Sequence, residues 1–188
     1  MFKKVLILAV LISFVSCSSE FSEKEKQEYT VKGKEIAQAT FKELSTNLMT
    51  QMKAGGPAQA IPFCNQEASP ITEALSKKYN VEIKRTSNKL RSCDNDPSER
   101  EIEIMDSYEQ LMLENKELKP IVEIDENQKK HFYAPIKIKA NCLVCHGKVN
   151  ETMTVETDSI IKSIYQFDIA TGYTEGDLRG LWSITFNK

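Results

Sequence analysis

The feature that most constrains this chain is the string Cys142-Leu143-Val144-Cys145-His146. Two thiols three residues apart can reach the two vinyl groups on one side of a porphyrin and form thioethers with them. A histidine directly after the second thiol then lies below the ring, with an imidazole nitrogen facing the iron. C-x-x-C-H is the attachment signature of c-type haem. One copy therefore predicts one covalent haem c, held by Cys142 and Cys145, with His146 on the haem iron.

Two other kinds of site also contain a C-x-x-C pair. A structural zinc site needs four ligands, but Cys64, Cys93 and His131 offer neither a second C-x-x-C nor paired histidines. A thioredoxin-type redox pair needs its first cysteine at a helix start after a parallel strand, in a βαβ setting. The alternating strands described below do not build that scaffold. Haem fits the sequence better than either alternative.

The first 16 residues have the pattern of an export signal. Lys3 and Lys4 precede a nearly continuous apolar run over residues 5–15, which is shorter than the roughly 20 residues of a membrane span. Ser16-Cys17 resembles the lipobox of bacterial lipoproteins, in which the peptidase cuts before the cysteine and its thiol carries lipid, although Phe14 departs from the usual aliphatic residue. The alternative is an ordinary secretory leader that ends in a cysteine.

This pattern predicts a lipoprotein signal peptide over residues 1–16, a polar tether over 17–29 and a haem domain over 30–188. We expect an exported protein, lipid-anchored through Cys17 to a bacterial membrane and facing the periplasm or the cell exterior. Thiols in such an oxidising compartment usually pair, bind metal or react. The net charge of −2 and the pI near 5.8 offer no basic face for nucleic acid.

The spacing of apolar residues predicts the elements of the mature chain. The first helix is expected over 29–53, and a short one that carries Cys64 follows the break Gly55-Gly56-Pro57. A third helix is expected from the N-cap Ser69 to 79, and a fourth from the N-cap Asp96 to about 117. The last is expected over 157–165. Strands are expected over 81–86, 120–124, 131–138 and 180–186. Because helices come first and an antiparallel set of strands later, the predicted class is α+β.

Four stretches resemble a known family: residues 61–65 (IPFCN), 81–91 (VEIKRTSNKLR), 142–147 (CLVCHG) and 170–183 (ATGYTEGDLRGLWS). The family comprises the exported bacterial c-type haem domains with a PAS-like fold, which occur alone or as sensory ectodomains and were long described as a domain of unknown function. The resemblance implies a central antiparallel sheet with flanking helices and a long N-terminal helix that can pair two chains as a homodimer.

The resemblance also implies that Cys64, in the Phe-Cys-Asn stretch, is the second axial ligand of the haem iron. A thiolate ligand stabilises ferric iron and so lowers the reduction potential. Several alternatives remain open at the level of sequence. Cys64 can form a disulfide with Cys93 or be an inert buried thiol, and His131 or Met153 can be the sixth ligand instead.

Several basic and aromatic residues are candidates for the haem surroundings. Guanidinium groups match carboxylate geometry, so the propionate candidates are Arg85, Lys89, Arg91 and Arg179, with solvated surface charge as the alternative. The candidates for the pocket wall are Phe132, Tyr133, Tyr173 and Trp182, with ordinary core packing as the alternative.

These features predict a haem-binding redox or gas sensor that passes its signal to an unknown partner protein. The alternative is a lipid-anchored single-haem electron carrier with an unknown redox partner. The sequence contains no Ser-His-Asp grouping, no Gly-rich phosphate loop and no paired-carboxylate site. We therefore do not expect an enzyme.

Overall fold

The computed structural model describes residues 21–187, so the predicted signal peptide and Cys17 lie outside the described residues. In chain order, the elements are α1 (Glu23–Tyr79), β1 (Val81–Thr86), η1 (Cys93–Asn95), α2 (Glu99–Leu113), β2 (Ile121–Ile124), β3 (Lys130–Lys137), η2 (Ala140–Cys142), α3 (Leu143–His146), α4 (Val155–Ile164) and β4 (Leu178–Phe186). Among residues 21–187, no helix is both long and apolar enough to cross a membrane.

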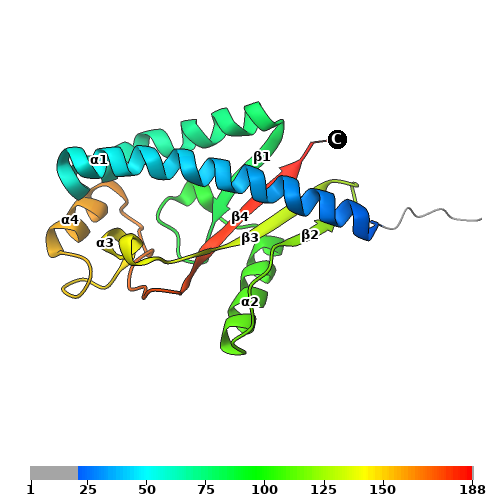
Figure 1. Cartoon of the computed structure of the whole chain (residues 1–188). Coiled ribbons are helices and arrows are strands. Elements are labelled where there is room, and N and C mark those ends of the chain that lie inside the picture. The colour runs from blue at the N-terminus through cyan, green and yellow to red at the C-terminus, as the bar shows by residue number, and fades with distance from the viewer. Residues whose placement is uncertain (1–20, 188) are drawn as a thin grey trace, which may run out of the picture.

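The four strands form one antiparallel sheet in the order β1-β4-β3-β2. The last strand of the chain lies inside the sheet, between β1 and β3 (Figure 1), and most of its side chains are buried. With its long N-terminal helix, this arrangement confirms the predicted α+β class and is consistent with a PAS-like fold. All four predicted strands are present, within two residues of their expected ends.

The long α1 consists of two helical arms joined at Gly55 and Gly56, whose backbone angles are not helical. Gly56 has a φ of 64°, a conformation that glycine adopts at little cost. In Figure 1 the chain reverses at this point, and the second arm runs back toward β1. The first arm begins at Glu23, because Ser22 forms a capping box with Glu25. The last residues of the segment expected to be a tether are therefore helical.

The second arm corrects one sequence prediction. Ser69 is not a helix N-cap: it lies inside a helix that continues to Tyr79 past Pro62 and Pro70. A proline removes one backbone donor but keeps a helical φ. The arm also packs in two places, through Ile61 in a cluster with α4 and through Leu75 and Tyr79 against the cluster that contains β1. The arm ends at Tyr79, as predicted, and the next residue, Asn80, has the left-handed conformation with a φ of 52°.

The start of α2 is also different from the prediction. The N-cap is Ser98 rather than Asp96: its hydroxyl accepts a hydrogen bond from the backbone N–H of Glu101, whose carboxylate accepts one from the Ser98 N–H. Both registers place a glutamate at the third helical position, but only Glu101 also reaches the Lys84 ammonium on β1. This tertiary contact favours the later start. The helix ends at Leu113, earlier than expected.

Alternate residues of the strands face two different helices. On one face, Phe132, Trp182 and Ile184 pack against Ile36 and Ala37 of the first arm of α1. On the other face, Tyr133 and Leu181 pack against α2. The sheet is thus covered on both sides.

A third buried cluster lies away from these two faces and joins the second arm to α4. It consists of Ile61, Met153 and Ile161, and Cys145 packs against it. The C-x-x-C-H segment is therefore anchored where α1, α3 and α4 meet.

Candidate functional site

The C-x-x-C-H segment forms η2 and the single-turn α3, directly after β3. The thiols of Cys142 and Cys145 are both half-buried, and neither forms a disulfide. The Cys145 thiol has its pKa raised, chiefly by burial. The structure thus presents both sulfurs on one short turn that is packed against the core on one side only.

The imidazole of His146 has one nitrogen engaged and one free. Its Nδ1 lies 2.7 Å from the carbonyl oxygen of Ala170, which can only accept, so Nδ1 carries the proton. Burial, together with the charges of Arg91 and Arg179, lowers the pKa of His146 well below its usual range. The ring is therefore neutral, and Nε2 makes no hydrogen bond to any residue that the structure describes. This is the form in which histidine ligates a metal.

Cys64 lies on the second arm of α1, near the C-x-x-C-H segment. It follows Ile61 within the same arm, and Ile61 belongs to the buried cluster against which Cys145 packs. Burial raises the pKa of Cys64 itself, and the nearby guanidinium groups of Arg85 and Arg91 oppose that rise. Cys93, by contrast, is exposed on η1 and is not bonded to Cys64. The fold thus brings Cys64, but not Cys93, into a half-buried position near Cys145.

Two of the arginines predicted from the sequence, Arg85 and Arg179, also belong to this region. Arg85 lies over the Trp182 ring, with its guanidinium carbon 5.9 Å from the ring centroid. Arg179 donates to the Lys89 carbonyl at 3.0 Å. Burial lowers the pKa of both arginines. Among residues 21–187, no carboxylate forms an ion pair with either of them.

Arg91, in contrast, is almost fully engaged. Its Nε donates to Asp168 at 3.0 Å, and its Nη2 donates to the carbonyls of Cys145 and Ala170. Only Nη1 is left without a partner among the described residues. The buried charge around His146 is therefore strongly positive, with Asp168 as the one carboxylate paired to this group. Such a site is complementary to the two propionates of a haem, and the donor set fits that cofactor.

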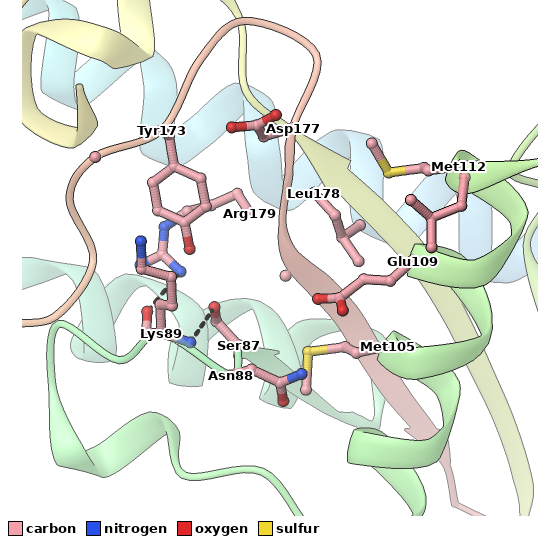
Figure 2. Close-up of a pocket in the computed structure, with 13 residues that line it drawn as sticks. Ser87, Asn88, Lys89, Met105, Glu109, Met112, Tyr173, Asp177, Leu178 and Arg179 are labelled. Carbon is pink, nitrogen blue, oxygen red and sulfur yellow. Dashed lines mark hydrogen bonds between the residues drawn. The ribbon is translucent and has the colours of Figure 1, made fainter. Parts of the chain in front are cut away.

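A pocket of about 410 Å³ lies beside these residues, between α2 and the loops at the end of the sheet. Figure 2 shows Lys89, Tyr173 and Arg179 on one wall, and Met105 and Met112 from α2 on the other. The ring of Tyr173 also meets the ring of His146 edge-on, with centroids 6.2 Å apart. The cationic wall of this pocket is thus continuous with the surroundings of His146.

The remaining candidates have other contacts. His131 on β3 lies 3.2 Å from an oxygen of Asp125 and 3.1 Å from the Thr185 hydroxyl, so both ring nitrogens are engaged. Met153 is only 2% exposed and packs in the core. Phe132 and Tyr133 are core residues of the sheet.

Sequence reasoning missed Asp168 and the carbonyl group of Ala170. Asp168 is a single acid in a chain that contains 27 Asp and Glu residues, and no motif distinguishes it from the exposed ones. The carbonyl of Ala170 belongs to a stretch that was noted for its resemblance to a family, but a backbone group leaves no residue-type signal. Both could be found only from the structure.

Comparisons with known proteins bear on the family and the fold of the chain. A family model described as Tll0287-like matches residues 15–187. Among solved structures, the chain is similar to the crystal structure of the cyanobacterial heme-protein Tll0287, with 18% sequence identity, a TM-score of 0.59, and coverage of 81% of this chain and 92% of that one. At this identity the likeness shows a shared fold. A comparison with curated proteins finds no match. Because the family model matches nearly the whole chain, the protein belongs to the Tll0287-like family.

Proposed function

We propose that this protein binds one c-type haem and acts as a redox or gas sensor on the outer side of a bacterial membrane. Cys142 and Cys145 carry the thioethers, and His146 is an axial ligand. The lipid on Cys17 anchors the chain. The family match and the shared fold with a protein titled as a heme-protein support haem binding. Export and lipid anchoring rest on the sequence pattern of residues 1–17.

The observation that carries haem binding is the state of His146. A neutral imidazole directly after C-x-x-C, with Nδ1 fixed by Ala170 and Nε2 unengaged, has the geometry of an iron ligand. The donated Nδ1 proton increases the donor strength of Nε2. When bound, the haem supplies an iron that exchanges one electron and accepts small gaseous ligands.

Cys64 is proposed as the second axial ligand. Burial disfavours its thiolate, so the thiol ionises readily only beside positive charge, which Arg85 and Arg91 supply. A thiolate in the sixth position stabilises ferric iron and can be displaced by a gas. If a gas displaced the Cys64 thiolate, the second arm of α1 would lose one of its attachments, and such a loss would distinguish a sensor from a simple carrier.

The propionates are proposed to face the unpaired cations. Arg85 and Arg179 have no carboxylate partner among the described residues, and Lys89 lies on the same wall as Arg179. Arg91 can offer only its Nη1. Buried guanidinium groups gain stability from such charges because desolvation is then offset by pairing.

The first arm of α1 is the surface that we consider for binding a partner. The first arm of α1 exposes Val31, Phe41 and Met49 on its surface. We propose this arm as the surface for pairing with a second chain, and an unidentified signalling or redox protein as the recipient of the signal. No enzymatic activity is proposed.

The test is a set of visible spectra of purified holoprotein from a host that attaches haem c. Wild type is expected to show a thiolate-ligated spectrum, and Cys64→Ala to lose it. Cys64→Met is expected to remain six-coordinate with a higher potential, and Cys93→Ala to resemble wild type. An unchanged spectrum in Cys64→Ala would remove Cys64 from the iron.

Sensor and carrier are separated by titration with carbon monoxide or nitric oxide. A gas-induced loss of the thiolate spectrum, absent in Cys64→Ala, supports the sensor. Rapid and reversible electron exchange without ligand displacement supports the carrier instead.

A further inference from the structure

One segment satisfies the last backbone carbonyls of the haem-binding turn. Residues 168–173, which we call the strap, run across the C-terminal end of α3. The Tyr173 N–H donates to the His146 carbonyl at 3.0 Å, and the Gly172 N–H donates to the Gly147 carbonyl at 2.9 Å. The terminal carbonyls of a helix need partners from elsewhere, and here they come from the strap.

Besides the His146 ring, the Arg91 side chain also connects the strap to α3. The Nη2 of Arg91 donates to the Cys145 carbonyl at 2.6 Å and to the Ala170 carbonyl at 3.3 Å, and its Nε donates to Asp168 at 3.0 Å. One of these acceptors lies on α3 and two lie on the strap. Because a guanidinium is rigid and planar, it sets the positions of all three relative to one another.

Asp168 is the buried counter-charge of Arg91. Its side chain is 1% exposed, against 15% for Arg91. The oxygen that accepts from Arg91 also accepts from the Ala170 N–H at 3.1 Å, while the other oxygen is buried and has no hydrogen-bond partner among residues 21–187. A buried pair of this kind contributes little to stability compared with well-packed apolar side chains. The pair matters more for how it orients the groups that it contacts.

We propose that Arg91 and Asp168 are a positioning pair that sets the orientation of the His146 imidazole. They act by fixing both the N–H and the carbonyl of Ala170, whose carbonyl accepts the Nδ1 proton. Neither side chain contacts Nε2. This inference rests on the proposed function, because the ring orientation matters for chemistry only if His146 ligates iron.

Two kinds of change follow. Asp168→Asn keeps the size and the acceptor oxygen but leaves the Arg91 charge uncompensated close to the iron ligand. An added positive charge disfavours ferric iron, so the reduction potential is expected to rise. Arg91→Lys offers one ammonium in place of a planar fork, so it cannot serve all three acceptors, and the imidazole is expected to lose its single orientation.

The experiment compares holoproteins carrying Asp168→Asn, Arg91→Lys and the double change Arg91→Gln/Asp168→Asn. The matched control is Arg100→Gln, which removes an arginine from a pair with Glu123 that lies between α2 and β2. Four measurements are made: covalent haem by mass, the reduction potential, the g values of the ferric haem in electron paramagnetic resonance, and amide exchange at Gly172 and Tyr173.

The positioning role predicts shifted g values and a raised reduction potential in Asp168→Asn. In Arg91→Lys it predicts a broader distribution of g values. The reduction potential of the double variant is expected to lie closer to that of wild type than the potential of Asp168→Asn does. Arg100→Gln is expected to match wild type. Faster amide exchange with unchanged g values and potential would show that the pair only supports the fold, and would overturn the proposal. If Asp168→Asn fails to fold, Arg91→Lys decides by the same g values. Wild type without covalent haem would overturn the proposed function, and this inference with it.

Discussion

The ammonium of Lys84 lies 2.8 Å from a carboxylate oxygen of Glu101, and this ion pair ties β1 to the first turn of α2. Only 7% of the Glu101 side chain is exposed, and 28% of that of Lys84. Burial raises the pKa of Glu101, but the hydrogen bonds from Lys84 and Ser98 outweigh it, so the pKa is lowered overall from 4.5. The pair therefore gives the α2 start a pH-dependent stability.

Glu101→Gln is expected to lower the free energy of unfolding at pH 7 by about 1–3 kcal/mol, the range for an interrupted buried, charged hydrogen bond. Because the folded pKa is depressed, the contribution of Glu101 is complete above its unfolded pKa near 4.5. It is lost as the pH falls through the lower folded value. Denaturant unfolding of both proteins between pH 7 and pH 3 checks this. The exposed pair Glu28–Lys32 supplies the control, since Glu28→Gln is expected to change the free energy of unfolding much less than Glu101→Gln does. A constant difference at every pH would contradict the prediction.

Gly33 marks the closest approach of α1 to the sheet. A Cβ at this position would overlap the ring of Phe132, which is fully buried. Gly33→Ala is therefore expected to destabilise the protein by about 1–3 kcal/mol, as overpacked cores do. Because alanine otherwise stabilises a helix relative to glycine, a loss of stability in Gly33→Ala would indicate the overlap with Phe132. Thermal unfolding measures it.

Lys34→Ala on the exposed side of the same helix is the comparison for Gly33→Ala, and it is expected to be nearly neutral. A stabilised Gly33→Ala variant would mean that α1 does not pack this tightly on β3.

The proposed covalent attachment of haem depends on two sulfurs. Cys142→Ala/Cys145→Ala is expected to yield no haem that survives denaturation and washing with acidic acetone, because no thioether can form. Mass spectrometry of wild type is expected to show one added haem. Cys93→Ala, which removes an exposed thiol elsewhere, is expected to retain it. Colour lost equally from wild type would refute attachment through the C-x-x-C-H segment.

The reactivity of Cys64 reports on its surroundings when no haem is bound. Burial raises its pKa above the ordinary 9.0, and Arg85 opposes that rise. In a background lacking Cys17, Cys93, Cys142 and Cys145, alkylation of Cys64 is expected to be slow at neutral pH and to increase only at alkaline pH. Arg85→Met is expected to move this profile to still higher pH, because the positive charge near the thiolate is lost. The rate of reaction with iodoacetamide against pH measures both profiles.

Arg100→Met is the matched control for that experiment, since it removes an exposed arginine on α2. Its alkylation profile should coincide with that of the parent. If Arg85→Met also coincides with the parent, the guanidinium of Arg85 does not act on Cys64.

Local chemistry made several elements predictable. Period-two alternation located β1. The Gly55-Gly56 pair marked a helix break, because glycine adopts backbone conformations that few other residues do. The starts at Ser69 and Asp96 were wrong for a shared reason. Each prediction relied on a local capping pattern, whereas the structure holds the second arm through Ile61 and Leu75 in two buried clusters and the start of α2 through the Lys84 contact.

The sequence alone determined the chemistry that Cys142, Cys145 and His146 can perform, because that chemistry depends on the spacing of these residues along the chain within one turn. It also determined the α+β class, through the periodicity of apolar residues. Only the tertiary structure decided which distant groups surround His146. Cys64, Arg91 and Asp168 are separated from one another by 27 and 77 residues along the chain, and their proximity to the haem-binding turn follows from the reversal of α1 and the course of the strap. Contacts over such separations depend on how whole elements pack, and no local pattern encodes them.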